Sequence, residues 1–171
     1  MRKIYIHLLL GVLVLLGACT STTPHQTTLT FTTSADGPFF AGPNSLISTY
    51  EVNLNELIDG QQLTADQIAK VSVNKVTATI PTSDSTTVDN FLNATLQFVA
   101  DDVPMTSIAV KNPIEGTGNS IELNASQEVD LSDFFKQKSF SVLLDWDFNE
   151  DRYAESLGTI VEMELTFEIK N

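Results

Sequence analysis

Residues 140–148 read Phe-Ser-Val-Leu-Leu-Asp-Trp-Asp-Phe, and this stretch decides the fold. Large apolar side chains occupy every second position, with serine, leucine or aspartate between them. Successive side chains of a strand point to opposite faces, so the pattern predicts a β-strand with one face in a core. Residues 161–169 repeat it, with Val161 through Ile169 alternating with Glu162, Glu164, Thr166 and Glu168. We predict that these two strands pair as a hairpin across a turn at Glu150 to Gly158.

Weaker period-two segments lie on the N-terminal side of this pair. Apolar residues change parity near Asn74 and Lys75, which predicts a β-bulge or a strand that passes between layers. Short helical turns are predicted over 65–70, where Thr64 and Gln67 form a capping box, over 88–93, and over 131–136 after Asp130. The further strand candidates are 48–54, 71–80, 95–99, 107–111 and 121–123, with a first strand near Leu29. We therefore expect an all-β domain over 29–171, a single immunoglobulin-like β-sandwich of about seven strands with short helical turns.

The first nineteen residues carry a different signal. Arg2 and Lys3 precede an apolar run from Ile4 to Leu16, which is followed by Gly17, Ala18 and Cys19. A run of this length is too short for a spanning helix, which needs about 20 apolar residues. An ordinary signal peptide would explain the run but not the cysteine. Leu16-Gly-Ala-Cys19 resembles the lipobox of bacterial lipoproteins, which implies removal of residues 1–18 and a covalent lipid on Cys19.

The residues after the cysteine bear on location. The resemblance implies an outer-membrane anchor facing the periplasm, because Thr20 replaces the aspartate of inner-membrane retention and no acidic export cluster follows. Residues 19–28 are threonine-rich and are expected to form a disordered tether. The strand pattern beyond them is similar in texture to small Bacteroidota lipoproteins of unassigned function.

The net charge of the chain limits the kinds of molecule that it can bind. Loss of Arg2 and Lys3 from the nine basic residues leaves seven against twenty-two acidic ones. Such a surface repels phosphate backbones, so nucleic acid is excluded as a partner. Cys19 is the sole cysteine, so the chain forms no internal disulfide.

Four oxygen-bearing residues at alternate positions form a candidate calcium site: Asp145, Asp147, Asn149 and Asp151. Carboxylate and amide oxygens are the ligands that calcium prefers. The spacing fails as an EF-hand, because Glu150 stands where the turn glycine belongs and Ser156 where the bidentate glutamate belongs. A solvent-facing strand edge explains the same spacing without a metal.

Catalytic machinery is scarce in the sequence. The two histidines are His7, in the predicted signal, and His25, in the predicted tether. This argues against serine–histidine and cysteine–histidine nucleophiles and the usual zinc centres. We expect a protein that is not an enzyme and has no cofactor, with a minor carboxylate hydrolase as an alternative.

Three aromatic residues are candidates for core or contact roles. Trp146 is expected in the core, on the apolar face of its strand. Phe39 and Phe40 lie in a loop flanked by glycine and proline, and either cap one end of the sandwich or form a contact surface. Ser85, in Asp84-Ser-Thr86, resembles the short O-glycosylation motif of Bacteroidota.

These features predict a lipid-anchored envelope protein that acts as a binding or structural module. An envelope protein is the expected partner besides the membrane, and a surface that binds glycan or calcium is the alternative.

Overall fold

The computed structural model describes residues 21–58, 62–82, 86–153 and 156–171, and these residues form eight strands. Every strand pairs antiparallel with its neighbours. The strands are β1 (Thr22–Asp36), β2 (Gly42–Glu51), β3 (Ile68–Thr79), β4 (Phe91–Ala100), β5 (Val103–Lys111), β6 (Ser120–Ala125), β7 (Ser139–Phe148) and β8 (Ser156–Lys170). The expectation of an all-β chain is confirmed.

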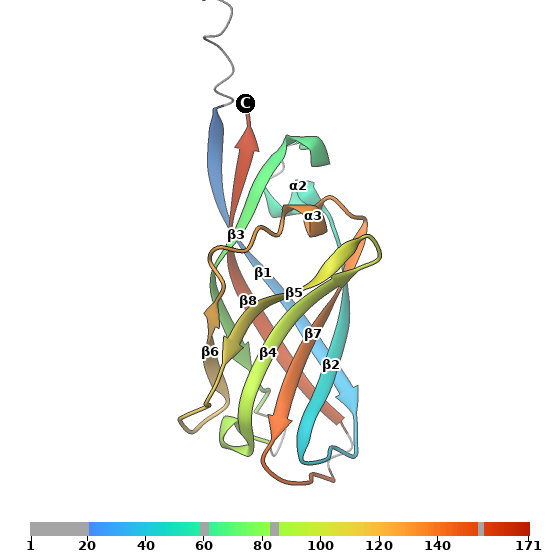
Figure 1. Cartoon of the computed structure of the whole chain (residues 1–171), viewed down its shortest axis with the longest axis vertical. Helices are drawn as coiled ribbons and strands as arrows, with labels where there is room; N and C mark the ends of the chain where they lie inside the picture. Colours follow the sequence, from blue (N-terminus) through green and yellow to red (C-terminus); the bar gives the residue numbers. More distant parts are fainter. Residues whose placement is uncertain (1–20, 59–61, 83–85, 154–155) are drawn as a thin grey trace, which may run out of the picture.

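Strand pairing is nested. β1 pairs with β8, β2 with β7, β3 with β6 and β4 with β5, so the chain folds back on itself at the β4–β5 turn. This long hairpin is wound into a closed barrel with the order β1-β2-β7-β4-β5-β6-β3-β8 (Figure 1). Eight antiparallel strands wound in this nested way form a jelly roll.

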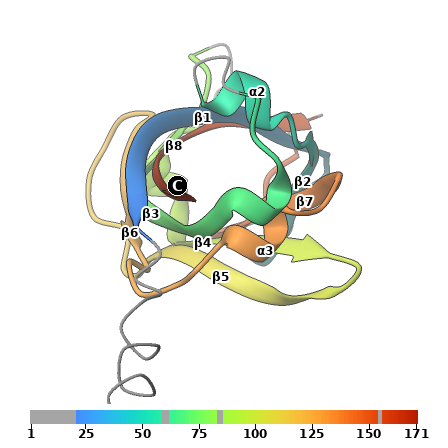
Figure 2. The ribbon, with the colours of Figure 1, turned by 90° about the horizontal axis from the view of Figure 1, so that it is seen from above.

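The barrel consists of two four-stranded sheets joined at two narrow seams. One sheet is β1-β8-β3-β6 and the other is β2-β7-β4-β5. At one seam, β1 and β2 are in register at Ser34 and Ile47; at the other, β5 and β6 pair over Ala109 and Val110. Seen along the barrel, the strands form a ring (Figure 2). The two-sheet expectation holds in outline, but eight strands in a closed barrel replace the seven-stranded immunoglobulin-like sandwich.

The predicted hairpin between residues 140–148 and 161–169 is wrong. β7 lies between β2 and β4, and β8 lies between β1 and β3, in the opposite sheet. Both strands bury every second residue along their length, and this accounts for their strong alternation. A strand with neighbours on both sides and a core on one face buries every second residue along its length.

The predicted tether over 19–28 is also corrected. β1 begins at Thr22 and pairs with β8 from Thr22 opposite Lys170 to Asp36 opposite Ser156. The side chains of 22–28 are exposed or half-buried, so the sequence pattern gave no sign of a strand there. Main-chain hydrogen bonds need no apolar side chains, and here they extend the domain seven residues towards Cys19.

The predicted β-bulge lies in β3. Val73 is opposite Leu165 and Lys75 is opposite Glu164, which leaves Asn74 as the extra residue. Asn74 and Lys75 are both exposed, and the buried residues on either side of them, Val73 and Val76, face the same core. The parity change in the sequence therefore marks a bulge and not a crossing between layers.

Aromatic residues from short helices and loops fill the two ends of the barrel. The end at which Thr22 and Lys170 lie, here called the terminal end, carries α2 (Leu54–Leu57) and α3 (Ser132–Phe135) (Figure 1). Phe134 and Phe135 of α3 are buried against Phe140 at ring-centroid distances of 5.9 and 5.4 Å. The predicted helical turns are present as 3-10 turns over Ala65–Gln67 and Val88–Asn90 and as α3.

Within the described ranges, no helix is both long enough and apolar enough to cross a membrane.

Candidate functional site

Two of the residues singled out in the sequence, Cys19 and Ser85, lie outside the described residues. The other candidates lie at the end of the barrel opposite the termini, here called the loop end. The β1–β2 loop, the turn before β4 and the β7–β8 loop meet there. It is the lower end in Figure 1.

The four calcium candidates are engaged with separate partners. Asp145 and Asp147 face outward, half-buried, and accept hydrogen bonds from Ser45 and from Asn93 (2.6 Å for Asn93). The Asn149 amide donates to the carbonyl of Asp89 at 3.0 Å, and the Asp151 carboxylate accepts from the backbone N–H of Ala41 at 2.9 Å. Among the residues that the structure describes, no three His, Cys, Asp or Glu side chains gather as metal ligands would.

Trp146 lies in the core, as the alternation predicts. Its side chain is fully buried and lies against Phe91, with ring centroids 4.2 Å apart. Its indole N–H donates to the hydroxyl of Thr159, which is also fully buried, at 3.1 Å. A buried indole N–H needs such a partner.

Phe39 and Phe40 have opposite environments. Phe39 is buried and stacks on Phe148, with ring centroids 5.3 Å apart and planes 4° from parallel. It closes the loop end of the barrel as the Phe134–Phe135 pair closes the other. Phe40 points away from the core and is 58% exposed. The capping role therefore fits Phe39, and a contact role for the exposed Phe40 stays a prediction.

The loop that carries Phe40 is tied down on both sides. The N–H groups of Phe39 and Arg152 each donate to the other residue's carbonyl at 2.8 Å. Asn44 donates to the carbonyls of Phe40 and Gly42 at 2.7 and 2.8 Å. Gly42 has φ of 101°, a backbone conformation that residues with a Cβ rarely adopt. These contacts fix the position of Phe40 without burying it.

We call residues 36–42, 88–90 and 149–153 together the loop-end tip. Its charged side chains are Arg152 and four exposed acids: Asp36, Asp89, Glu150 and Asp151. Arg152 is held in an ion pair with Glu150, with Nη2 and Oε1 2.9 Å apart. Tyr153 follows and is 82% exposed. Arg152 and Tyr153 could not be found from the sequence, because their place beside the β1–β2 loop depends on the pairing of Arg152 with Phe39, 113 residues earlier in the chain.

A cavity of about 520 Å³ lies nearer the terminal end, between the β4–β5 turn, the residues after α3 and the start of β7. Asp101 and Asp102 line it together with Lys136 and Lys138. A glycosidase needs two carboxylates that flank the scissile bond. The two aspartates here are consecutive residues of the β4–β5 turn, and the hydrolase alternative stays a prediction.

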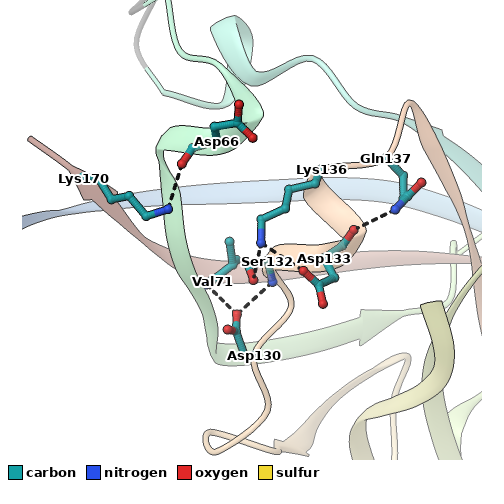
Figure 3. A network of polar contacts seen from close by, with 8 residues as sticks. All are labelled: Asp66, Val71, Asp130, Ser132, Asp133, Lys136, Gln137 and Lys170. Atoms are coloured by element: carbon teal, nitrogen blue, oxygen red, sulfur yellow. Dashed lines mark hydrogen bonds and ion pairs between the residues drawn. The ribbon is translucent and has the colours of Figure 1, made fainter. Parts of the chain in front are cut away.

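Asp130 fastens α3 to β3 (Figure 3). Its carboxylate accepts hydrogen bonds from the N–H groups of Ser132 at 2.9 Å and Val71 at 3.1 Å. Burial alone would raise the pKa of Asp130. The hydrogen bonds and the nearby Lys136 ammonium favour the charged form more strongly and hold the pKa below its ordinary value. The Asp130 carboxylate therefore stabilises the packing of α3 on β3.

Comparisons with known proteins give remote likenesses. The chain matches no known protein family and no curated protein. Among solved structures, it resembles the decameric BFDV capsid protein at 10% identity and a TM-score of 0.35, over 85% of this chain and 99% of the other. It resembles a structure of turnip yellow mosaic virus at 12% identity and a TM-score of 0.27, over 87% and 96% of the two chains. Such scores carry no argument about function.

Proposed function

We propose that this protein is a lipid-anchored, non-enzymatic binding module of the bacterial cell envelope, attached through Cys19. One observation carries the proposal: the eight strands of the barrel all lie between Thr22 and Lys170. Removal of residues 1–18 therefore leaves every strand and its pairing intact. An apolar segment that precedes these strands in the sequence and ends in a lipobox fits a cleaved lipoprotein signal.

The anchor has a simple energetic basis. Each buried methylene of an acyl chain contributes about 0.8 kcal/mol, and stable attachment needs more than one chain. The lipid that the lipobox implies carries several chains, so the protein would leave the membrane slowly. Thr20 favours the outer membrane, with the barrel in the periplasm.

The composition of the domain and its exposed aromatic residues support the binding role. Residues 19–171 contain one histidine, His25, on β1, and one cysteine, Cys19. Two strongly exposed aromatic residues of the described chain, Tyr153 and Phe40, both lie at the loop end of a barrel whose interior is filled. A rigid scaffold with exposed aromatic loops is typical of a binding module.

The test is membrane fractionation of the full chain in a bacterial host with its own lipoprotein-processing enzymes. Wild type should float with membranes and yield an N-terminal peptide that begins at Cys19 and carries acyl mass. Cys19→Ala should be released to the soluble fraction without that mass, whereas the control Thr20→Ala should behave like wild type. Membrane retention of Cys19→Ala, or wild type without acyl mass, would overturn the anchor.

A further inference from the structure

We infer that the loop-end tip is a docking surface for another protein, which receives Phe40 in an apolar pocket rimmed by lysine or arginine. The orientation part of this inference rests on the proposed anchoring at Cys19. The chemistry of the contact does not.

The first step is the shortness of the link between lipid and barrel. Thr20 and Ser21 separate Cys19 from the start of β1. Ser21 is tied to Asn171, whose backbone N–H donates to the Ser21 carbonyl at 3.1 Å and whose side chain donates to the Ser21 hydroxyl at 3.0 Å. Three residues span at most about 10 Å, so an anchored barrel has its terminal end at the bilayer.

The second step is the position of the tip. β1 runs from the terminal end to the loop end over fifteen residues, or about 45–50 Å along the strand. The loop-end tip begins where β1 ends, at Asp36. In an anchored molecule it lies at the end of the barrel away from the bilayer, so a partner reaches it without contacting the membrane.

The third step is the shape of the contact. Phe40 is exposed, yet the hydrogen bonds of Asn44 and the pairing of Phe39 with Arg152 hold its loop in place. A ring that is already ordered loses little conformational entropy when it binds. Buried aromatic anchors that fill a pocket carry much of the free energy of protein–protein binding. A ring that projects from a turn is suited to enter a pocket.

The fourth step is charge. The arginine of the tip is paired with Glu150. The exposed carboxylates of Asp36, Asp89 and Asp151 remain at the same end of the barrel as Phe40, and Asp151 accepts a hydrogen bond from the backbone N–H of Ala41, the next residue after Phe40. Opposite charge steers association and selects the partner. A neutral glycan offers neither positive charge nor a pocket for the ring. The complement of this surface is therefore an apolar pocket with a basic rim.

The experiment places a photo-cross-linking phenylalanine at position 40 of the full-length chain, expressed in its own host cells. The matched control carries the cross-linker at Met105 on β5, which is 57% exposed against 58% for Phe40. We expect a discrete adduct from position 40 and none from position 105. Its cross-linked peptide should contain apolar residues flanked by lysine or arginine. No adduct, equal adducts at both positions, or a peptide without basic residues would overturn the inference.

A second measurement gives the strength of the contact. Once the adduct is identified, binding of the purified partner is measured with wild type, Phe40→Ala and Met105→Ala. Loss of a central aromatic anchor should weaken binding about 10- to 30-fold, with little change for Met105→Ala. Binding should also weaken with added salt, since the Debye length falls from about 10 Å at 0.1 M to about 3 Å at 1 M. Equal affinities, or no response to salt, would contradict the proposed contact.

A third measurement separates this inference from the anchor. Fluorophores on Ala41→Cys and on Lys170→Cys report energy transfer to acceptors in the headgroup layer of vesicles that hold the lipidated protein. Transfer should be strong from position 170 and weak from position 41; equal transfer would refute the upright orientation. If Cys19→Ala stays on membranes while position 40 still cross-links, the anchor fails and the docking surface stands.

Discussion

The indole N–H of Trp146 on β7 donates a hydrogen bond to the hydroxyl of Thr159 on β8, and these two strands belong to opposite sheets. The bond therefore crosses the interior of the barrel and joins the two layers. Thr33 lies directly opposite Thr159 in the β1–β8 register and is equally buried. Its hydroxyl has no partner among the residues that the structure describes. Two neighbouring buried threonines thus have opposite hydrogen-bonding states.

Replacing each of these two threonines by valine should have different effects on stability. Thr159→Val should lower the free energy of unfolding by about 1–3 kcal/mol, because the indole N–H is left buried without an acceptor. Thr33→Val should be neutral or stabilising, because it removes a buried hydroxyl that makes no bond. Urea denaturation followed by the fluorescence of the single tryptophan measures both. Equal losses in the two variants would show that the cross-barrel bond is not what distinguishes them.

The two phenylalanines of the β1–β2 loop give a second prediction. Phe39→Ala should cost about 3–5 kcal/mol, since it removes a buried ring from the end of the core. Phe40→Ala should stay within about 0.5 kcal/mol of wild type, since the ring is largely in water. Thermal and urea unfolding of both variants provide the comparison. A large loss in Phe40→Ala would mean that this ring stabilises the loop, and would weaken its assignment as a contact residue.

Asp130 predicts a pH dependence with a definite sign. Its pKa is lower in the folded protein than in the unfolded chain, where an aspartate titrates at about 3.9. The stabilisation is therefore present above pH 3.9 and is lost as the pH falls through the lower, folded value. Asp130→Asn should be less stable than wild type at pH 7, and the difference should shrink as the solution is acidified below pH 4.

Asp133, in helix α3, provides the control for this prediction. Asp133 forms an exposed ion pair with Lys136 at 2.9 Å (Figure 3), and pairs of this kind contribute at most about 1 kcal/mol. Asp133→Asn should therefore change the free energy of unfolding less than Asp130→Asn at pH 7. A constant gap between wild type and Asp130→Asn at every pH would disprove the link to ionisation.

The bulge in β3 predicts which residue can be deleted. Removal of Asn74 leaves Val73, Lys75 and Val76 in regular alternation, so every core residue keeps its face, and the loss includes one exposed hydrogen bond to Thr166. Removal of Ser72 instead turns the valines on its two sides to opposite faces. The Asn74 deletion should fold and unfold cooperatively, and the Ser72 deletion should not. Circular dichroism and urea titration decide between the two outcomes.

The sequence by itself determined which face is buried in the strands with clear alternation. The alternation of 140–148 and 161–169, the parity change at Asn74 and the core position of Trp146 all follow from a period of two. The helical turns after Thr64 and Asp130 could also be predicted. The buried face of a strand and the capping of a turn both depend on residues within a few positions of each other.

Only the tertiary structure decided which strands are neighbours. β1 pairs with β8 across the whole chain, from Thr22 opposite Lys170 onward, and no local pattern encodes a partner so distant in sequence. Phe39 is likewise more than a hundred residues from its partners Phe148 and Arg152. These long-range contacts bury Phe39, whereas Phe40 stays at the surface. Pairing with β8 also makes residues 22–28 part of a strand. The main-chain hydrogen bonds of this pairing leave no periodic pattern in the side chains. Which face of a strand is buried is a local property of the chain. The partner of each strand, the closure of the barrel and the composition of the loop-end tip depend on contacts that form when the barrel closes.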